Sequence, residues 1–377
     1  MKISRFAIAL LAVTCLIAAA CGDDDDDTAS TTTAPTTAAP TTTAAPTTMA
    51  PLDCSSLDVN GDNEVRVGVA TAGPRDDGAY YQALVEFVES FSADDECFGD
   101  PIIVDRIDAS EAATELSNLA QQDVDIIAVG ASEIAEPLAE LTVEYSDIFW
   151  YCNCGAGYQP LDTLAQSQDD ASEILYTAGY ATGLLLQESG GDSAAFIGCC
   201  DLGFEKEAYL AFEMGLQAVD ESYTMTYTPT GNFPFDFDNV SGATEAFDAA
   251  IQNGVDAVNP YLGGAHRPLV QIANENDIIV MSAGSSKACE DEELDYDIAV
   301  RFDAGDYLAT IFDEIQSGDF QEGSVRVFRV GVDSEPGAVI CDATDEQQAA
   351  MDDVYDQIAN NEFAADFGAI KGQAYSG

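Results

Sequence analysis

The sequence predicts an α/β protein made of two doubly wound parallel-sheet lobes joined by a hinge. Three observations support this fold class: apolar strand-like runs alternate with longer amphipathic stretches, the alternating series occurs twice, and the segment that follows is long enough to return to the first lobe. Repeated units of this kind form parallel sheets with helices on both faces. Ligands of open parallel sheets bind outside the carboxyl ends of the strands, so two facing lobes would form a hinged cleft.

The first series contains four strand-like runs, and helical patterns follow the first three. Helices are expected where apolar residues recur every three or four positions, and strands where short apolar runs are bounded by turn residues. The expected strands span residues 65–71, 102–107, 124–129 and 148–152, and the expected helices span residues 79–91, 111–121 and 134–145. We place lobe 1 at about residues 64–165, together with part of the C-terminal tail.

A long helical stretch at residues 171–188 leads into the second series. Its expected strands span residues 194–199, 224–228, 257–261 and 278–282, and its expected helices span residues 205–219, 241–253 and 267–274. We place lobe 2 at about residues 190–320. The tail adds strands at 298–302 and 325–332 and helices at 304–316 and 345–360. The chain therefore repeats one architecture and then extends beyond it.

The first 20 residues have the features of an export signal. Lys2 and Arg5 provide a positive start, an apolar core follows, and small residues precede Cys21. The apolar core is too short to be a good membrane span. A cysteine at this place resembles a bacterial lipobox, in which Cys21 would become the lipidated first residue of the mature chain. An ordinary cleaved signal with an incidental cysteine is the alternative.

Residues 21–51 have the composition of a stalk. The aspartates at positions 23–27 lead into a tract of Thr, Ala and Pro with too few large apolar residues to fold. Such tracts are often O-glycosylated, which the sequence leaves open. We therefore expect residues 52–377 to form a substrate-binding domain held by lipid at the extracytoplasmic face of the cell membrane.

The charge balance excludes several kinds of partner. The chain has 12 Lys and Arg residues and 69 Asp and Glu residues, which gives a formal net charge of −57. A field this negative repels nucleic-acid phosphates.

Four of the scarce cations follow predicted strands: Arg75, Lys206, Arg267 and Lys287. They either offset local repulsion between carboxylates or hold a ligand that carries carboxylate or phosphate oxygens.

Eight cysteines remain when Cys15 of the signal and Cys21 are set aside. An even number in an exported chain favours disulfides. We expect two long-range bridges, Cys54–Cys97 and Cys289–Cys341. Two close pairs, Cys152 with Cys154 and Cys199 with Cys200, have zinc binding as an alternative, but the only histidine is far away in sequence and export favours disulfides.

Other patterns do not indicate a metal site or an enzyme. The segment 58–64 has oxygen-bearing residues at alternate positions, as a calcium loop does. Asn63 replaces the expected glycine and Val69 replaces the bidentate carboxylate, so we predict a turn. His266 has no obvious Ser or Cys partner, and nucleophile-elbow and phosphate-loop motifs are absent from the sequence. We expect a binder without cofactor or metal, and not an enzyme.

The run VRVGVATAGPRDDGAYYQALVEF resembles the opening strand, loop and helix of the basic membrane protein family of substrate-binding lipoproteins. VDIIAVGASEIAEPLAELTVEYSDIFWYC, ASEILYTAGYATGLLL, AAFIGCCDLGFEKEAYLAFEMGLQAV and GVDSEPGAVICDATDEQQAAMDDVYDQI resemble later parts of that family, in a consistent order over about residues 64–363. The resemblance implies a type I periplasmic-binding-protein fold. It also implies delivery of a small ligand, a purine nucleoside in the best-understood branch, to the permease and ATPase complex of an ABC importer.

The resemblance implies roles for several residues. Asp76 and Asp77 match the family's acidic pair, and Tyr80 falls where an aromatic ring stacks on the base. Tyr81 stands where the family has an asparagine, and Ala72 is near a position where an acidic residue is expected. Further positions that match the family are Asn153 at the end of the fourth strand, Asp201 after the first strand of lobe 2, and Gly263 and Gly264 at a glycine-rich strand end.

The residues themselves also support binding roles. Tyr80 and Tyr81 can present flat rings for stacking, although one of the two could belong to the core. Ser132 lies at a predicted helix start where free N–H groups could bind an oxygen, but it is also a good N-cap, and the N-cap interpretation is favoured. The phenylalanines at 233, 235 and 237 alternate, so they either seal the cleft or pack into lobe 2.

We therefore predict a lipid-anchored solute-binding protein of an ABC importer. A sugar or another small polar solute is the alternative ligand, and a ligand sensor that presents to a membrane receptor is the alternative role. The predicted ligand-binding residues are Asp77, Tyr80, Tyr81, Ser132, Asn153, Asp201, Phe235, Gly263 and Gly264, and the predicted lipidation site is Cys21.

Overall fold

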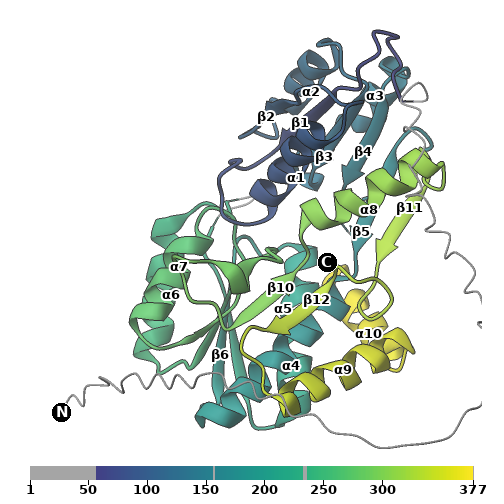
Figure 1. Ribbon diagram of the computed structural model, residues 1–377. Coiled ribbons are helices and arrows are strands. Elements are labelled where there is room, and N and C mark those ends of the chain that lie inside the picture. The colour runs from purple at the N-terminus through teal and green to yellow at the C-terminus, as the bar shows by residue number, and fades with distance from the viewer. Residues whose placement is uncertain (1–56, 156–157, 232–235, 377) are drawn as a thin grey trace, which may run out of the picture. The chain divides into compact units, whose positions relative to one another are not determined.

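Two parallel sheets form the centres of two lobes in the computed structural model, which describes residues 57–155, 158–231 and 236–376 (Figure 1). Leu52–Gly377 is one compact unit. The predicted fold class, two doubly wound parallel-sheet lobes, is confirmed. We use "lobe 1" for the six-stranded sheet and its helices, and "lobe 2" for the four-stranded sheet and its helices.

The sheet of lobe 1 is parallel throughout and has the order β11-β5-β4-β3-β1-β2. Its strands are β1 (Val67–Thr71), β2 (Ile102–Val104), β3 (Ile126–Gly130), β4 (Phe149–Asn153), β5 (Ala165–Asp169) and β11 (Val325–Phe328). Thr71 is in register with Gly130, and Asn153 is in register with Ser167. The carboxyl ends of the central strands therefore meet at one edge of the sheet.

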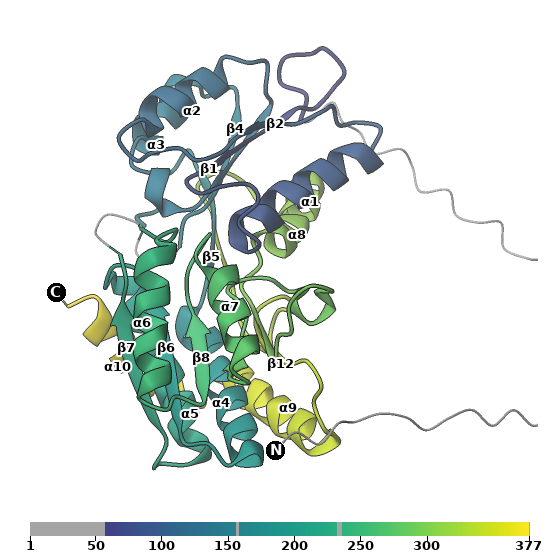
Figure 2. The ribbon, with the colours of Figure 1, turned by 90° about the vertical axis from the view of Figure 1, so that its left-hand side faces the viewer.

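Helices cover both faces of this sheet (Figure 2). α1 (Tyr80–Asp94) and α8 (Ala304–Ser317) pack together on one face, with β1 and β3 side chains beneath them. α2 (Ala112–Ala120) and α3 (Leu138–Glu144) cover the other face, after the 3₁₀ turn η2 (Ser132–Ile134). Strands covered on both faces bury alternate side chains in two separate cores, which explains their continuous apolar runs.

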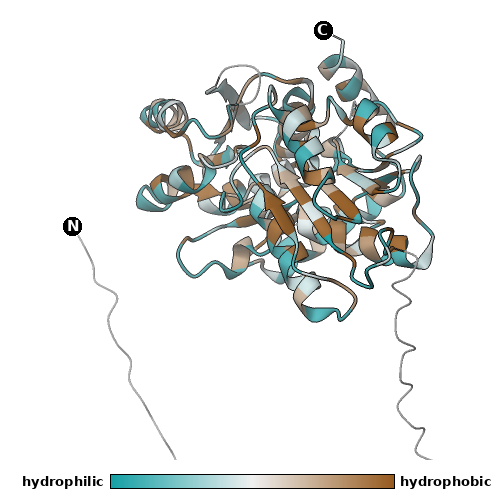
Figure 3. Cartoon of the chain, turned by 90° about the horizontal axis from the view of Figure 1, so that it is seen from above, coloured by the Kyte–Doolittle hydropathy of each residue, from teal (hydrophilic) through white to brown (hydrophobic). Residues whose placement is uncertain are grey.

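Lobe 2 repeats this arrangement with a parallel sheet of order β7-β6-β8-β9. Its strands are β6 (Ser193–Gly198), β7 (Thr224–Pro229), β8 (Ala257–Pro260) and β9 (Ile279–Val280). One face carries α4 (Ala171–Ser189) and α5 (Gly203–Val219), and the other carries α6 (Val240–Gln252) and α7 (His266–Glu275). The strands are mostly brown and the outer helix faces mostly teal in Figure 3, as burial of the sheets requires.

α4 and α5 pack unusually closely because glycines face each other across the contact. A Cβ added at Gly179 would overlap the carbonyl of Phe212, and one added at Gly215 would overlap the carbonyl of Tyr176. Backbones can approach this closely only where a side chain is absent. α4, the longest helix of lobe 2, therefore packs closely on the C-terminal half of α5.

The chain crosses between the lobes several times. After lobe 2 it forms β10 (Ile298–Arg301), returns to lobe 1 as α8 and β11, and goes back as β12 (Gly337–Ile340), which pairs antiparallel with β10. α9 (Asp345–Ala359) and α10 (Ala364–Ala374) then pack on α4 and α5. Crossings of this kind form a hinge, because a few loop residues can absorb a rotation of one lobe against the other.

Three elements were not predicted from sequence: β5, β12 and α10. β5 reads AQSQD and has no apolar run, yet β4 and β11 flank it and Gln166 and Ser167 are fully buried. The hydroxyls of Ser167 and Tyr151 lie 2.6 Å apart, and the side-chain oxygen of Gln166 accepts from the Leu161 N–H at 3.2 Å, whereas the side-chain nitrogen of Gln166 is buried without a partner. β11 ends at Phe328, four residues before the predicted end at 332.

Three disulfides join described cysteines. The predicted Cys289–Cys341 bridge is confirmed. The two close pairs are also disulfides, Cys152–Cys154 and Cys199–Cys200, so their thiolates are not available to zinc. Cys97 is disulfide-bonded, whereas Cys54, its predicted partner, lies outside the described residues.

The segment 58–64 forms a turn. The Asp58 carboxylate accepts hydrogen bonds from the backbone N–H groups of Gly61 and Asn63, at 2.6 and 2.9 Å. Aspartate side chains that accept hydrogen bonds from nearby backbone N–H groups are typical of turns.

Among the described helices, none combines the length and apolar character that a bilayer crossing needs.

Candidate ligand-binding site

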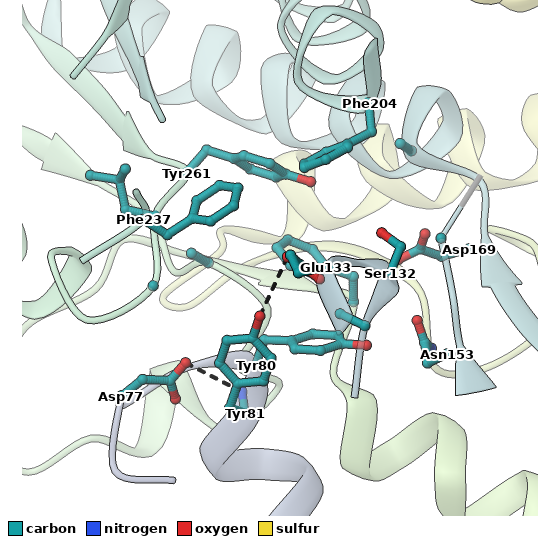
Figure 4. A pocket seen from close by; sticks show the side chains of 17 residues that line it. Asp77, Tyr80, Tyr81, Ser132, Glu133, Asn153, Asp169, Phe204, Phe237 and Tyr261 are labelled. Atoms are coloured by element: carbon teal, nitrogen blue, oxygen red, sulfur yellow. Dashed lines mark hydrogen bonds between the residues drawn. The ribbon is translucent and has the colours of Figure 1, made fainter. Parts of the chain in front are cut away.

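A cavity lies between the lobes, at the carboxyl ends of strands from both sheets (Figure 4). Its walls include the loop after β1 and the start of α1, η2 after β3, the ends of β4 and β5, the start of α5 and the residues after β8. It contains about 910 Å³ of empty space, part of which is continuous with solvent. A concave site lined by aromatic rings and a few polar groups is typical of sites for small organic molecules.

Aromatic rings form two opposed walls of the cavity. Phe204, Phe237 and Tyr261 lie on one side in Figure 4, and Tyr80 and Tyr81 lie on the other. The Phe204 and Phe237 rings are stacked, with centroids 6.2 Å apart and planes 26° apart. The two tyrosines meet edge to face, with ring centroids 5.4 Å apart. A flat ligand between these walls could stack on both lobes at once.

Asp77 is buried at the N-terminal end of α1. Its carboxylate accepts hydrogen bonds from the backbone N–H groups of Ala79 and Gln82, at 2.9 and 3.0 Å. Burial raises the pKa of Asp77 although these hydrogen bonds act in the opposite direction. The residue caps the first turn of α1 and so fixes the helix that carries Tyr80 and Tyr81.

Glu133 supplies an unpaired acceptor to the cavity. One carboxylate oxygen accepts from the Tyr81 hydroxyl at 3.4 Å, and the other is buried without a hydrogen-bond partner. Burial raises the pKa of Glu133 to about 7, and the Tyr81 hydrogen bond offsets part of this rise. The hydroxyl of Tyr80 is likewise buried without a partner. Buried polar groups without partners are costly, and a ligand could satisfy both.

Asp169 adds a third carboxylate, at the end of β5. Burial, together with repulsion from Glu207 and Asp170, raises the pKa of Asp169 to about 7. No Lys, Arg or His is among the described residues that line the cavity. The site therefore offers aromatic faces and hydrogen-bond acceptors but no positive charge, which favours ligands that donate hydrogen bonds over anions.

No protein-family model matches this chain, and no curated protein is significantly similar to it. Solved structures are similar. The chain has the fold of periplasmic binding proteins. An ABC transporter system solute-binding protein from Conexibacter woesei DSM 14684 is 21% identical with a TM-score of 0.59, over 79% of this chain and 97% of that one.

Two further structures with this fold are similar over most of their length. An ABC transporter system solute-binding protein from Aeropyrum pernix K1 is 12% identical with a TM-score of 0.66, over 82% of this chain and 99% of that one. A transcriptional activator of the comK gene from Bacillus halodurans is 15% identical with a TM-score of 0.58, over 78% of this chain and 96% of that one. At these identities the similarity establishes the periplasmic-binding-protein fold.

The structure brings six of the predicted residues to the cleft of this periplasmic-binding-protein fold. They are Asp77, Tyr80, Tyr81, Ser132, Asn153 and Gly263. Gly264 follows Gly263 but does not line the cavity, and its N–H donates to the Asp238 carboxylate at 2.6 Å. Phe235 lies outside the described residues, and Phe237, from the same alternating run, lines the cavity.

Asp201 does not line the cavity. It is exposed after β6, where its φ of 56° turns the chain into α5, and its carboxylate lies 3.6 Å from the Lys206 ammonium. Two of the other three cations have acidic partners as well: Arg75 pairs with Asp105 at 3.0 Å and Arg267 with Asp291 at 2.8 Å. These pairs support the interpretation that the cations offset local repulsion.

Sequence reasoning missed Glu133, Asp169, Phe204 and Tyr261, all of which line the cavity. Glu133 adjoins the predicted Ser132, so a search of the whole turn after β3 would have found it. Asp169 had no such signal, because β5 itself was not predicted. Phe204 follows a predicted strand and Tyr261 ends one, and only this position at or after a strand end distinguished them from core aromatics.

Proposed function

We propose that this chain is the extracytoplasmic solute-binding component of an ABC importer and that its cleft takes a small, flat organic solute that donates hydrogen bonds. The observation that carries the proposal is the cavity between the lobes, where opposed aromatic walls surround acceptors without a cation. Concave sites with a few convergent polar groups are typical of ligand pockets. The periplasmic-binding-protein fold supports a binding role in which lobe closure traps the solute.

A purine nucleoside fits these requirements best. Its base could stack between the rings of Tyr80 and Phe204, while ribose hydroxyls or an exocyclic amino group donate to Glu133 and Asp169. A nucleotide fits poorly, because its phosphate would face carboxylates with no lysine or arginine in the described lining. A sugar is the alternative ligand, since its hydroxyls could use the same acceptors without the stacking.

The lobes would bind the solute from both sides. Tyr80 and Glu133 belong to lobe 1, and Phe204 and Tyr261 belong to lobe 2, so a ligand touching all four stabilises the closed arrangement. The closed form would then dock on the permease and ATPase complex. The lipid anchor at Cys21, which lies outside the described residues, would keep the domain at the membrane.

A ligand sensor is the second candidate role. One structure with this fold bears the name of a transcriptional activator, so the same architecture has been assigned outside transport. Co-purification would separate the two roles: the importer role requires association with a permease, and the sensor role requires association with a receptor.

The ligand proposal is tested by titrating residues 52–377 with inosine, adenosine, ribose and inosine monophosphate. Thermal unfolding is the readout, because a ligand bound only by the folded state raises the melting temperature. The single tryptophan, Trp150, is fully buried and donates to the Tyr145 carbonyl, so its emission is a poor reporter of the cleft. We expect shifts with the nucleosides and none with the monophosphate.

Tyr80→Ala should weaken inosine binding by roughly 1–3 kcal/mol, the range measured for base–aromatic stacking. Tyr180→Ala is the matched control, since Tyr180 packs on the α4 side of lobe 2 and does not line the cavity. Ribose binding that equals inosine binding would replace the nucleoside with a sugar. A domain stabilised by none of the four compounds at millimolar concentration would contradict the ligand proposal.

A further inference from the structure

The Cys199–Cys200 disulfide joins neighbouring residues at the carboxyl end of β6, directly before the helix that carries Phe204. Cys199 is fully buried. Nothing in the proposed binding role so far uses this bridge, although it sits at the edge of lobe 2 that faces the cavity. Bridging adjacent residues closes a small ring through their shared peptide, which restricts the local backbone far more than a long-range bridge does.

The first set of contacts fixes the pair from the α5 side. The Glu205 carboxylate, which is itself fully buried, accepts hydrogen bonds from the backbone N–H groups of Cys199 and Leu202, at 2.5 and 2.9 Å. It also accepts from the N–H of Cys200 at 3.0 Å. Phe204 is adjacent to Glu205 in the first turn of α5, so the pair, the turn and this ring form one rigid connection.

The second set of contacts reaches the residue before Phe237. The backbone N–H of Asp236 donates to the sulfur of Cys199 at 3.0 Å and also lies 3.3 Å from the sulfur of Cys200. The carbonyl of Phe237 in turn accepts from the N–H of Gly263 at 3.2 Å. The two sulfurs therefore anchor a segment that places one aromatic wall residue and is tied to another residue of the cavity lining.

We propose that the Cys199–Cys200 disulfide is a positioning element that sets the spacing of Phe204 and Phe237 and thereby the selectivity for flat ligands. The proposal rests on the proposed binding function. Both rings follow the bridge in the chain, and they stack at a centroid distance of 6.2 Å. Two separate serine or cysteine side chains would rotate independently, and each could leave the Asp236 N–H without its acceptor.

The test compares two double variants of residues 52–377, each lacking one disulfide. Cys199→Ser/Cys200→Ser removes the proposed positioning element, and Cys289→Ser/Cys341→Ser removes a bridge whose cysteines do not line the cavity. Affinities for inosine and ribose are measured by calorimetry. We expect the first variant to lose about tenfold or more in inosine affinity, the loss of about one stacking contact, with little change for ribose. The control should change both affinities by less than about twofold.

A coupling measurement separates positioning from general destabilisation. In a Phe237→Ala background one of the two rings that the disulfide places is gone, so removing the disulfide should cost less inosine affinity than it does in the wild-type background. A disulfide that only stabilises lobe 2 would lower inosine affinity equally in both backgrounds. If the serine variant does not fold, the same cycle is measured with Cys199→Ala/Cys200→Ala, which retains the apolar character of the buried site.

Inosine affinity that is unchanged by removal of the bridge would overturn the positioning role while leaving the nucleoside-binding proposal intact. If removal of the bridge lowers inosine affinity equally with and without the Phe237 ring, the positioning role would be overturned as well. A wild-type domain that does not bind inosine in the same titration would overturn both proposals together. The three outcomes are distinguishable because wild-type binding is measured first.

Discussion

Replacing Glu133 with glutamine should change how ligand affinity depends on pH. In the unliganded cavity Glu133 and Asp169 are buried carboxyl groups with a pKa of about 7 each. A solute that donates hydrogen bonds prefers the ionised carboxylates, so binding competes with protonation. The affinity of the wild-type domain for inosine should therefore rise as the pH increases from 6 to 8.

The expected size follows from the ionised fraction. A group with a pKa of about 7 is roughly 10% ionised at pH 6 and roughly 90% ionised at pH 8, and the apparent affinity scales with the competent fraction. Each carboxylate that must be ionised therefore contributes about tenfold over this range. Wild type should change by up to about a hundredfold, Glu133→Gln by about tenfold, and Glu133→Gln/Asp169→Asn by little.

Calorimetric titration with inosine at pH 6, 7 and 8 measures this series directly. The lining tyrosines and His266 should not titrate over this range. Burial raises the pKa values of the lining tyrosines Tyr80, Tyr81 and Tyr261 above their usual range, and burial lowers the pKa of His266 to about 4. An affinity that is independent of pH in the wild-type domain, or a dependence that persists in the double variant, would refute the reasoning.

The same pKa shift predicts an effect on stability. The folded state holds the Glu133 proton more tightly than the unfolded state, so this group's contribution to stability is fully present below about pH 4.5 and is lost as the pH rises to about 7. Relative to the wild-type domain, unliganded Glu133→Gln should gain stability over this interval, by at most about 3 kcal/mol. Urea midpoints at pH 5 and pH 8 would measure the difference, and a constant difference would contradict the shift.

Gly215→Ala should destabilise the domain by roughly 1–3 kcal/mol or more, because its methyl group would overlap a backbone carbonyl of α4. Gly372→Ala is the control: the site is exposed and open, so denaturant midpoints should show no loss and a gain of up to about 1 kcal/mol. Arg329→Met should cost about 3–5 kcal/mol, since it leaves the buried Glu173 carboxylate without its ion-pair partner, and an unchanged urea midpoint would contradict this. Cys21→Ser should release the full-length protein from membranes or leave it unprocessed, and wild-type protein found entirely in the soluble fraction would rule out the anchor.

Local sequence patterns were sufficient for most of the fold. The run VRVGVAT predicts a strand at 65–71, and the structure has β1 at Val67–Thr71 because a strand covered by helices on both faces needs apolar residues at successive positions. The helix expected at 171–188 is α4, which ends at the left-handed Gly190. Such signals are local, since capping and amphipathic spacing involve residues within a few positions of each other.

β5 shows where local signals fail. Its sequence AQSQD would suit a loop, and it is a strand only because β4 and β11 supply hydrogen-bonding edges on both sides. β11 comes from a part of the chain more than 150 residues later. A polar segment becomes a buried strand when other elements satisfy its backbone and most of its side chains, as Tyr151 and Asn153 do for Ser167, and no local pattern records this.

The residues of the cavity also divide into those that the sequence predicted and those that only folding brought together. Asp77, Tyr80 and Tyr81 were predicted from one short run of sequence, through its resemblance to a family and its two adjacent rings, and in the structure the Asp77 carboxylate accepts from backbone N–H groups at the start of the helix that presents the rings. Glu133 and Asp169 became neighbours of these rings only through the packing of parallel strands, whose carboxyl ends lie at one edge. The raised pKa of each carboxyl group follows from burial and from charges brought close by folding, which are properties of three-dimensional position and not of any stretch of sequence.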